Sequence, residues 1–130
     1  MPTLRQHNDR RSKALGSRGE ALAAEHFERL GYRVLARNHR TRFGELDLVL
    51  ADPGDRTIVF AEVKTRSLGS GEPWESLHDA KQSQVRTMAA AWLAEVRERP
   101  FAAELRFDAV GVTLDSRGDL VRLDHLEAAF

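Results

Sequence analysis

The sequence predicts an α/β protein in which a central sheet is covered by helices on both faces. Residues 12–30 and residues 76–97 each carry apolar side chains at helical spacing and predict one helix each. Between them, residues 44–65 predict two strands joined by the turn-forming segment ADPGDR. The second of these strands, TIVFAEVKT, is apolar on both faces in its first part, which is typical of a strand buried between two layers.

The other strands are predicted from shorter patterns. Residues 32–37 predict a first strand, and the basic segment at residues 38–43 predicts a loop that leads into the hairpin. Residues 106–114 and 119–123 predict a closing hairpin around the turn DSRG. The resulting order is a helix, three strands, a second helix and the closing strands.

Length and composition predict one domain. A chain of 130 residues with 42% apolar and 31% charged residues is typical of a soluble globule, which we assign to residues 13–130. Residues 1–12 are polar and lack periodicity, so we expect a flexible N-terminal arm there. The absence of cysteine excludes disulfides and thiolate zinc sites. No apolar run reaches membrane-spanning length and the start is unlike a signal peptide, so we expect a cytoplasmic protein without membrane contact.

The charges are unevenly distributed, although the net charge is zero. Residues 1–44 contain ten Lys or Arg and four Asp or Glu, whereas residues 45–130 contain ten and sixteen. A basic front before an acidic segment fits a nuclease that binds phosphates and metal ions, and it equally fits arginines on a solvated helix. Only Lys13, Lys64 and Lys81 are lysines. In an arginine-rich chain, a lysine suits a role that needs a compact point charge.

The first helix carries an acid on its apolar face. We expect this helix to begin at the N-cap Ser12 and to end at Gly31. Gly16 and Gly19 flank Glu20 and are expected to let the helix approach its neighbour closely. Glu20 lies on the same face as the apolar residues Ala23, Ala24, Phe27 and Leu30. It is either a capping or rim carboxylate or part of a functional site.

The hairpin brings charged residues to the end of a hydrophobic strand. Because side chains alternate between faces, Glu62 and Lys64 share one face of the second strand. In the first strand, Asp47 lies opposite the face of the three leucines Leu46, Leu48 and Leu50. If the strands pair, Asp47 can lie beside Glu62 and Lys64, so that two acids and a lysine meet at the edge of the core.

Two interpretations of this cluster remain open. The first is a salt bridge of Lys64 with Glu62 or Asp47 that caps the edge of the sheet. The second is a metal site, because two carboxylates and a strand carbonyl offer the hard oxygens that Mg²⁺ or Mn²⁺ prefers. A lysine beside such an ion can position a water and stabilise charge on a phosphate.

The second helix continues this pattern. Ser76 and Asp79 form a capping-box pattern at its start. Its apolar stripe contains Val85, Met88, Ala89, Trp92, Leu93 and Val96. Lys81 extends that stripe toward the end of the strand that carries Glu62, so it is a second lysine on an inward face.

The order of these motifs resembles a known family. The segments GSRGEALAAEHFERLGYRVLARNHRTRFGELDLV, FAEVKTRSLGSGEPWESLHDAKQSQV and RFDAVGV resemble the YraN-like family of small bacterial proteins, over residues 13–130. This family is similar to archaeal Holliday-junction resolvases. Asp47 followed by Glu62-Val63-Lys64 resembles the motif of the PD-(D/E)xK nuclease superfamily, which has the restriction-endonuclease-like fold. Leu46 replaces the proline that precedes the aspartate in the superfamily, at a position that does not take part in the chemistry.

The resemblance implies a restriction-endonuclease-like fold, with a mixed central sheet and helices on both faces. It implies that Asp47 and Glu62 bind Mg²⁺ or Mn²⁺ and that Lys64 positions water. It also implies that Glu20 is a further catalytic acid, since related resolvases bring a helix glutamate to the metal centre. Similarity to resolvases implies DNA as partner and a possible homodimer, because cutting two strands requires two sites.

Basic residues around the hairpin are candidates for nucleic-acid binding. Arg40 and Arg42 lead directly into the hairpin, and Arg66 follows it. Together with Lys81, these arginines are expected to contact phosphates, although exposed arginines are also commonly just solvated. Trp74, in the Gly/Ser-rich segment after the strand, either anchors that segment or stacks on a base.

Three functions are compatible with the sequence. The first is a metal-dependent endonuclease acting on DNA, possibly branched or structured DNA. The second is a non-enzymatic nucleic-acid-binding or scaffold protein that retains the nuclease fold. The third is a partner-binding module that uses the segment around Trp74. The intact set of two acids and a lysine favours the first over the second.

Overall fold

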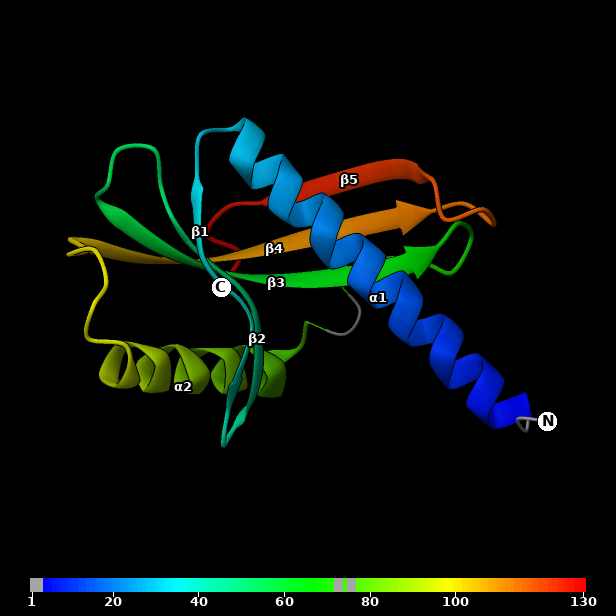
Figure 1. Cartoon of the computed structure of the whole chain (residues 1–130), viewed down its shortest axis with the longest axis horizontal. Helices are drawn as coiled ribbons and strands as arrows, with labels where there is room; N and C mark the ends of the chain where they lie inside the picture. Colours follow the sequence, from blue (N-terminus) through cyan, green and yellow to red (C-terminus); the bar gives the residue numbers. More distant parts are fainter. Residues whose placement is uncertain (1–3, 72–73, 75–76) are drawn as a thin grey trace.

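The computed structural model describes residues 4–71, 74 and 77–130. The chain forms, in order, α1 (Leu4–Arg29), β1 (Arg33–Thr41), β2 (Gly44–Ala51), β3 (Thr57–Ser67), α2 (Asp79–Glu95), β4 (Glu104–Leu114) and β5 (Leu120–Leu126) (Figure 1). This is the predicted order of elements.

The strands form one mixed sheet in the order β1-β2-β3-β4-β5. β1, β2 and β3 are an antiparallel meander, because short connections join them. β3 and β4 are parallel, and α2 lies in the crossover that this arrangement requires. β5 returns antiparallel to β4. The predicted α/β fold class is confirmed, and the arrangement is consistent with a restriction-endonuclease-like fold.

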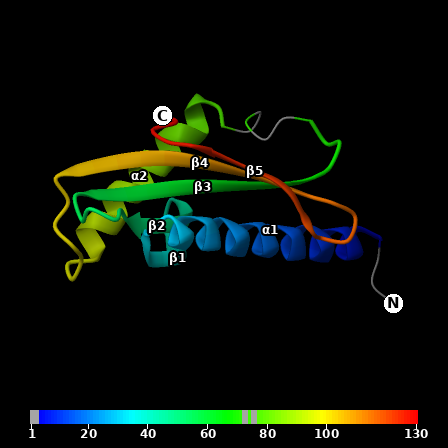
Figure 2. The ribbon, with the colours of Figure 1, turned by 90° about the horizontal axis from the view of Figure 1, so that it is seen from above.

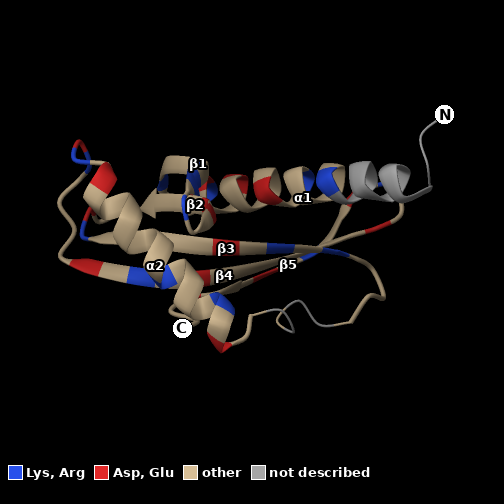
Figure 3. Ribbon diagram, turned by 90° about the horizontal axis from the view of Figure 1, so that it is seen from below, with Lys and Arg blue, Asp and Glu red and all other residues tan. Residues whose placement is uncertain are grey.

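The two helices lie on opposite faces of the sheet (Figure 2, Figure 3). On the α1 face, Ala23, Ala24 and Phe27 pack on Leu48, Leu50, Val59, Ala61, Val110, Val112 and Leu114. On the α2 face, Val85, Met88, Ala89 and Trp92 pack on Leu46, Val49, Ile58 and Phe60. β3 contributes to both layers, as its two-sided apolar pattern predicted.

α1 differs from the prediction at both ends. It begins at Leu4 rather than near Ser12, so residues 4–12 have helical backbone, while residues 1–3 of the expected arm lie outside the described residues. The flexibility of that arm stays a prediction. Leu30, expected on the apolar face, lies beyond the helix and is 50% exposed. α1 is nevertheless fixed to the sheet at Gly19, where an added Cβ would overlap the side chain of Thr65. Gly16 has no such neighbour, so the expectation of close approach was wrong there.

The predicted loop at residues 38–43 is mostly strand. β1 continues to Thr41, and a turn at Arg42 and Phe43 leads directly into β2. The hydroxyl of Thr41 accepts from the N–H of Phe43 at 3.1 Å and donates to the carbonyl of Gly44 at 2.9 Å. These bonds satisfy the turn locally, so the basic residues extend a hairpin instead of forming an irregular segment.

The β1–β2 hairpin leaves the main sheet near the candidate site. β2 pairs with β3 only over Leu48–Ala51, although β2 itself begins at Gly44. Leu46 therefore packs on the α2 face, whereas Leu48 and Leu50 pack on the α1 face, which corrects the expectation of one shared leucine face. Gln84 Nε2 donates to the carbonyl of Phe43 at 2.8 Å and so fixes the hairpin turn to α2.

α2 begins at Asp79, and its N-cap is His78, whose Nδ1 accepts from the N–H of Lys81 at 3.4 Å. The capping box predicted from Ser76 and Asp79 is therefore wrong in its cap residue, and Ser76 lies outside the described residues. Within the part of the chain that the structure describes, neither helix combines the length and the apolar character needed to cross a membrane.

Candidate functional site

Asp47 is fixed at the point where β2 separates from β3. The last residue pair between these strands is Leu48 with Ala61. Beyond it, the N–H of Val63 donates to Asp47 Oδ2 at 2.8 Å, so a side chain takes the place of a backbone acceptor. This contact brings Asp47 beside the strand segment that carries Glu62 and Lys64.

The two oxygens of Glu62 have different surroundings. Oε1 lies 3.0 Å from the ammonium of Lys81, across from β3 to the first turn of α2. Oε2 is buried and has no hydrogen-bond partner among the described residues. The side chain of Glu62 is 15% exposed, so the unpaired oxygen lies in a region where an unsatisfied charge is costly.

The negative charges of Asp47 and Glu62 repel one another at a place that is partly buried from water. Burial raises the pKa of Asp47 to about 8, and the charge of Glu62 adds to this rise. The N–H of Val63 and the charge of Lys81 act in the opposite direction but do not overcome it. A nearby divalent cation would favour the ionised form of both acids and thereby remove the repulsion.

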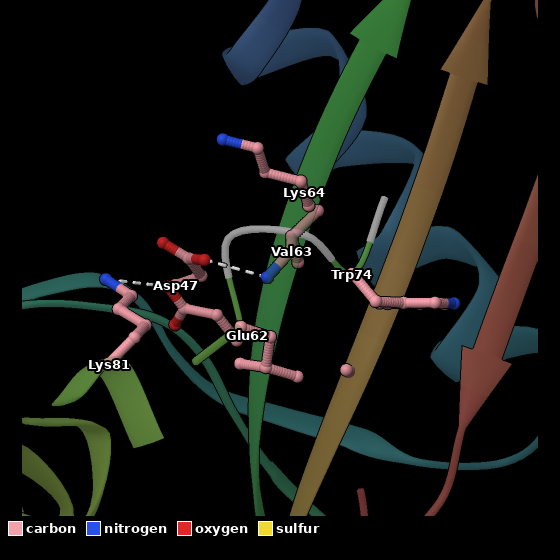
Figure 4. A pocket seen from close by; sticks show the side chains of 8 residues that line it. Asp47, Glu62, Val63, Lys64, Trp74 and Lys81 are labelled. Atoms are coloured by element: carbon pink, nitrogen blue, oxygen red, sulfur yellow. Dashed lines mark hydrogen bonds and ion pairs between the residues drawn. The ribbon is translucent and has the colours of Figure 1, made fainter. Parts of the chain in front are cut away.

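One pocket of about 330 Å³ brings these residues together (Figure 4). It is lined by Asp47, Glu62, Val63, Lys64, Trp74, Leu77, Lys81 and Ala109. Lys64 is exposed and extends from β3 on the side of Asp47, whereas the ring of Trp74 lies over β4. Among the described residues Lys64 forms no ion pair, so neither acid has the Lys64 salt bridge that the first interpretation expected.

Glu20 lies next to this pocket rather than in it. It lines a second pocket of about 390 Å³, whose wall of Val63 and Lys64 is shared with the first. Burial raises the pKa of Glu20, a hydrogen bond from the side chain of Asn38 lowers it, and the charge of Glu62 contributes a further rise. Asn38 has a φ of 50°, which Asn tolerates better than most residues.

The predicted phosphate contacts are spread over three places. Lys81 lines the first pocket and Arg66 lines the second. Arg40 and Arg42 are exposed on the β1–β2 hairpin and line neither pocket. Arg40 makes only a 3.9 Å ion pair with Glu45, and Arg42 lies over the ring of Phe43. Acidic and basic residues are intermingled over the helices and strands (Figure 3).

The residues at the first pocket fit a hard divalent ion. The donor set is two carboxylates, one of which has a buried oxygen without a partner in the described part of the chain. Among the side chains that the structure describes, in residues 13–71, 74 and 77–130, no group of three or more His, Cys, Asp or Glu is arranged to hold an ion. Two carboxylates suffice for Mg²⁺, which commonly keeps several waters and takes its remaining ligands from substrate phosphates.

A separate buried network was missed by the sequence analysis. Asp108, which is fully buried, accepts from Arg106 Nε and Nη2 at 2.7 Å each and from His125 at 2.8 Å. The other ring nitrogen of His125 lies 3.0 Å from His26 on α1. Burial would raise the pKa of Asp108, but the hydrogen bonds of His125 and Arg106 outweigh it and hold that pKa low. This network joins β4, β5 and α1.

Comparison with known proteins identifies the family. Residues 19–112, a range that includes every candidate site residue, match the family described as "Uncharacterised protein family UPF0102". The chain is 42% identical over 120 residues to a UPF0102 protein of Geobacter metallireducens, covering 92% of this chain and 93% of that protein. It is 43% identical over 119 residues to one of Nocardia farcinica, covering 91% and 90% respectively. The resemblance to the YraN-like family is thereby confirmed at the family level, and the chain belongs to the UPF0102 family.

Proposed function

We propose that the protein is a metal-dependent endonuclease that hydrolyses phosphodiester bonds in DNA. The observation that carries this proposal is the partly buried acid pair Asp47 and Glu62, which lines one pocket and includes a buried oxygen without a partner among the described residues. Such a pair is unfavourable by itself and favourable around a cation. The superfamily resemblance of the Asp47…Glu62-Val63-Lys64 motif supports the same conclusion.

Asp47 and Glu62 are the residues that would hold Mg²⁺ or Mn²⁺. When bound, such an ion polarises a phosphate oxygen and lowers the pKa of a coordinated water. Lys64, an exposed ammonium on the wall of the pocket, orients the attacking water and stabilises negative charge that develops on the phosphate. Glu20, on the other side of that wall, orients a water at the adjoining pocket.

The DNA backbone is bound by basic residues around the acid pair. Arg66 borders the adjoining pocket, and the exposed Arg40 and Arg42 extend the contact along the β1–β2 hairpin. Similarity to resolvases favours branched or structured DNA as substrate. It also favours a homodimer, since two active centres are needed to cut two strands.

The direct test is cleavage of labelled linear, nicked and four-way DNA with Mg²⁺, Mn²⁺ or EDTA. We expect cutting of at least one of these DNAs with an ion and none with EDTA. Asp47→Asn should abolish cutting while the fold and DNA affinity stay largely intact, because the change removes a ligand charge at nearly constant volume. Cutting by Asp47→Asn at the wild-type rate would point to a contaminating nuclease.

A second candidate function is a nucleic-acid-binding or scaffold protein without turnover. It is favoured by the placement of Glu20 outside the pocket of Asp47 and Glu62, which leaves two acids there, one of them paired with Lys81. DNA binding that is unchanged by EDTA, with no cutting under any condition, would establish this second function and exclude the first.

A further inference from the structure

The ammonium of Lys81 is paired with Glu62, one of the two acids proposed to hold the metal ion. Its Nζ is 3.0 Å from Glu62 Oε1, and its charge also favours the ionised form of Asp47. Among the residues that the structure describes, it is the only cation that forms an ion pair with an acid of this pocket. Lys81 is therefore the counter-ion of Glu62 when no metal ion is bound.

The side chain of Lys81 can leave this position without moving its helix. The backbone of Lys81 is fixed in the first turn of α2, where its N–H donates to the N-cap His78. The side chain is 33% exposed at the pocket, so its ammonium has access to water on one side. Four rotatable bonds give the lysine a range of positions around a fixed point.

A divalent ion and the ammonium compete for the same carboxylate. Both are attracted to Glu62, and like charges this close repel strongly in a shielded pocket. Binding of an ion at Glu62 therefore favours positions of Lys81 farther from that carboxylate. The exposed side of the pocket is where a phosphate would approach, and a phosphate is the next available partner for a free ammonium.

We propose that Lys81 is an exchangeable counter-ion, which a divalent metal replaces at Glu62 and which then binds a backbone phosphate of the nucleic acid. This inference rests on the proposed function, since it requires metal and nucleic acid at the same pocket. This exchange makes the binding of metal and of nucleic acid cooperative. Metal binding frees the ammonium of Lys81 to bind a phosphate, and phosphate binding keeps that ammonium from competing with the metal for Glu62. Lys81 is thus a positioning residue that couples the two binding events.

The first experiment titrates the full-length protein with Mn²⁺ and measures the heat of binding. Lys81→Gln should bind Mn²⁺ more tightly than wild type, by about 5- to 150-fold, because the competing charge is gone. Glutamine retains a neutral hydrogen-bond donor for Glu62, which protects the fold. Lys81→Arg, which keeps the charge, should stay closer to wild type. Arg97→Gln, beyond the far end of α2, makes the same change in net charge and should have no effect.

The second experiment measures binding of a short labelled DNA duplex in EDTA and in Mn²⁺, with all proteins carrying Lys64→Ala so that the DNA stays intact. With Lys81 present, Mn²⁺ should increase DNA affinity. With Lys81→Gln, the affinity in EDTA should be unchanged and most of the increase with Mn²⁺ should be lost. Tighter metal binding together with weaker metal-dependent DNA binding cannot result from misfolding, which would weaken both.

Two results would overturn the inference while leaving the proposed function intact. One is Mn²⁺ binding that depends on Asp47 but is no tighter in Lys81→Gln than in Arg97→Gln. The other is a loss of DNA affinity by the same factor in EDTA and Mn²⁺, which would make Lys81 a constant phosphate contact. If wild type binds no Mn²⁺, or if Asp47→Asn binds it equally well, the proposed metal site itself fails and the inference fails with it.

Discussion

Asp47 accepts a hydrogen bond from the N–H of Val63, so the acid on β2 is held by the strand segment that carries Glu62 and Lys64. The bond forms where β2 stops pairing with β3, so the Asp47 carboxylate accepts the hydrogen bond that a backbone carbonyl of β2 would otherwise accept. One local irregularity in the sheet thus places two carboxylates and a lysine around a single pocket.

Asp47→Asn should stabilise the metal-free protein at high pH. Because the pKa of Asp47 is raised to about 8, the folded state binds a proton that the unfolded state releases near 3.8, so stability is lost as pH rises through that window. The loss amounts to about 1.4 kcal/mol per pH unit at most. Urea unfolding in EDTA should show the stability advantage of the variant over wild type growing from pH 5 to pH 8 and levelling off above that.

Asp52, in the turn between β2 and β3, provides the control. Its pKa is lowered, because hydrogen bonds from the N–H groups of Thr57 and Arg56 outweigh the effect of burial. Asp52→Asn should therefore lower the free energy of unfolding at pH values above the ordinary Asp pKa. At acidic pH, where Asp52 is protonated in wild type as well, the difference between the two proteins should disappear. An Asp47→Asn protein that is less stable than wild type at every pH would contradict the account of Asp47.

Glu20→Gln should leave the metal-free fold at least as stable as wild type. Burial raises the pKa of Glu20, and glutamine removes the charge while keeping a partner for Asn38. The stabilisation of the protein by Mg²⁺ or Mn²⁺ should shrink in this variant, because a nearby ion favours the charged form. Thermal melting with and without metal measures both effects.

The exposed Glu25, whose only ion pair within the described residues is with Arg29 one helical turn away, gives the matched control. Glu25→Gln should change neither the melting temperature nor its response to metal by much. If wild type gains nothing from metal and Glu20→Gln is less stable in both conditions, Glu20 has a structural role only.

Gly19→Ala should destabilise the protein, whereas Gly16→Ala should not. A methyl at Gly19 overlaps the side chain of Thr65 and forces α1 away from β3, which costs about 1–3 kcal/mol. At Gly16 the space is open, and alanine in a helix gains up to about 1 kcal/mol over glycine. Urea unfolding of both variants measures the contrast, and equal effects at the two positions would contradict the close contact of α1 and β3.

Asp108→Asn should be strongly destabilising. It leaves the guanidinium of Arg106 without its buried partner, a loss that costs about 3–5 kcal/mol. Asp124, which pairs with Arg122 at the same spacing on the exposed edge strand, is the control, and Asp124→Asn should cost less than about 1 kcal/mol. Similar costs for the two variants would show that the Asp108 network does not hold β4 and β5 to α1.

Much of the fold could be predicted because its elements bury apolar faces. The apolar stripe of α2 and the two-sided apolar pattern of β3 can be seen in the sequence, because the side chains that are buried recur at the spacing of a helix or of a strand. Asp47 and Glu62 could be placed side by side because alternation in a hairpin fixes which side chains face each other. The N-terminal part of α1 could not be predicted, since residues 4–12 are polar and lack helical periodicity in the sequence. The helix axis there projects beyond the sheet (Figure 1).

The contacts that the sequence did not reveal join residues far apart in the chain. Lys81 was expected on an inward face, but its pairing with Glu62 depends on where α2 begins relative to β3. The pair His26 and His125 lies 99 residues apart, and no spacing rule links them. The departure of Leu46 from the leucine face arises because β2 leaves the sheet, and strand alternation alone cannot show where pairing stops.

The most direct test of the metal site is an anomalous difference map from crystals of the wild-type protein soaked in Mn²⁺. We predict one ion between Asp47 and Glu62, with ligand oxygens of both carboxylates about 2.1 Å away, and no ion in crystals of Asp47→Asn. The ion should lie against Glu62 Oε2, the oxygen that has no partner among the described residues. A map without an ion at these two acids, or with the same ion in Asp47→Asn, would contradict the central claim.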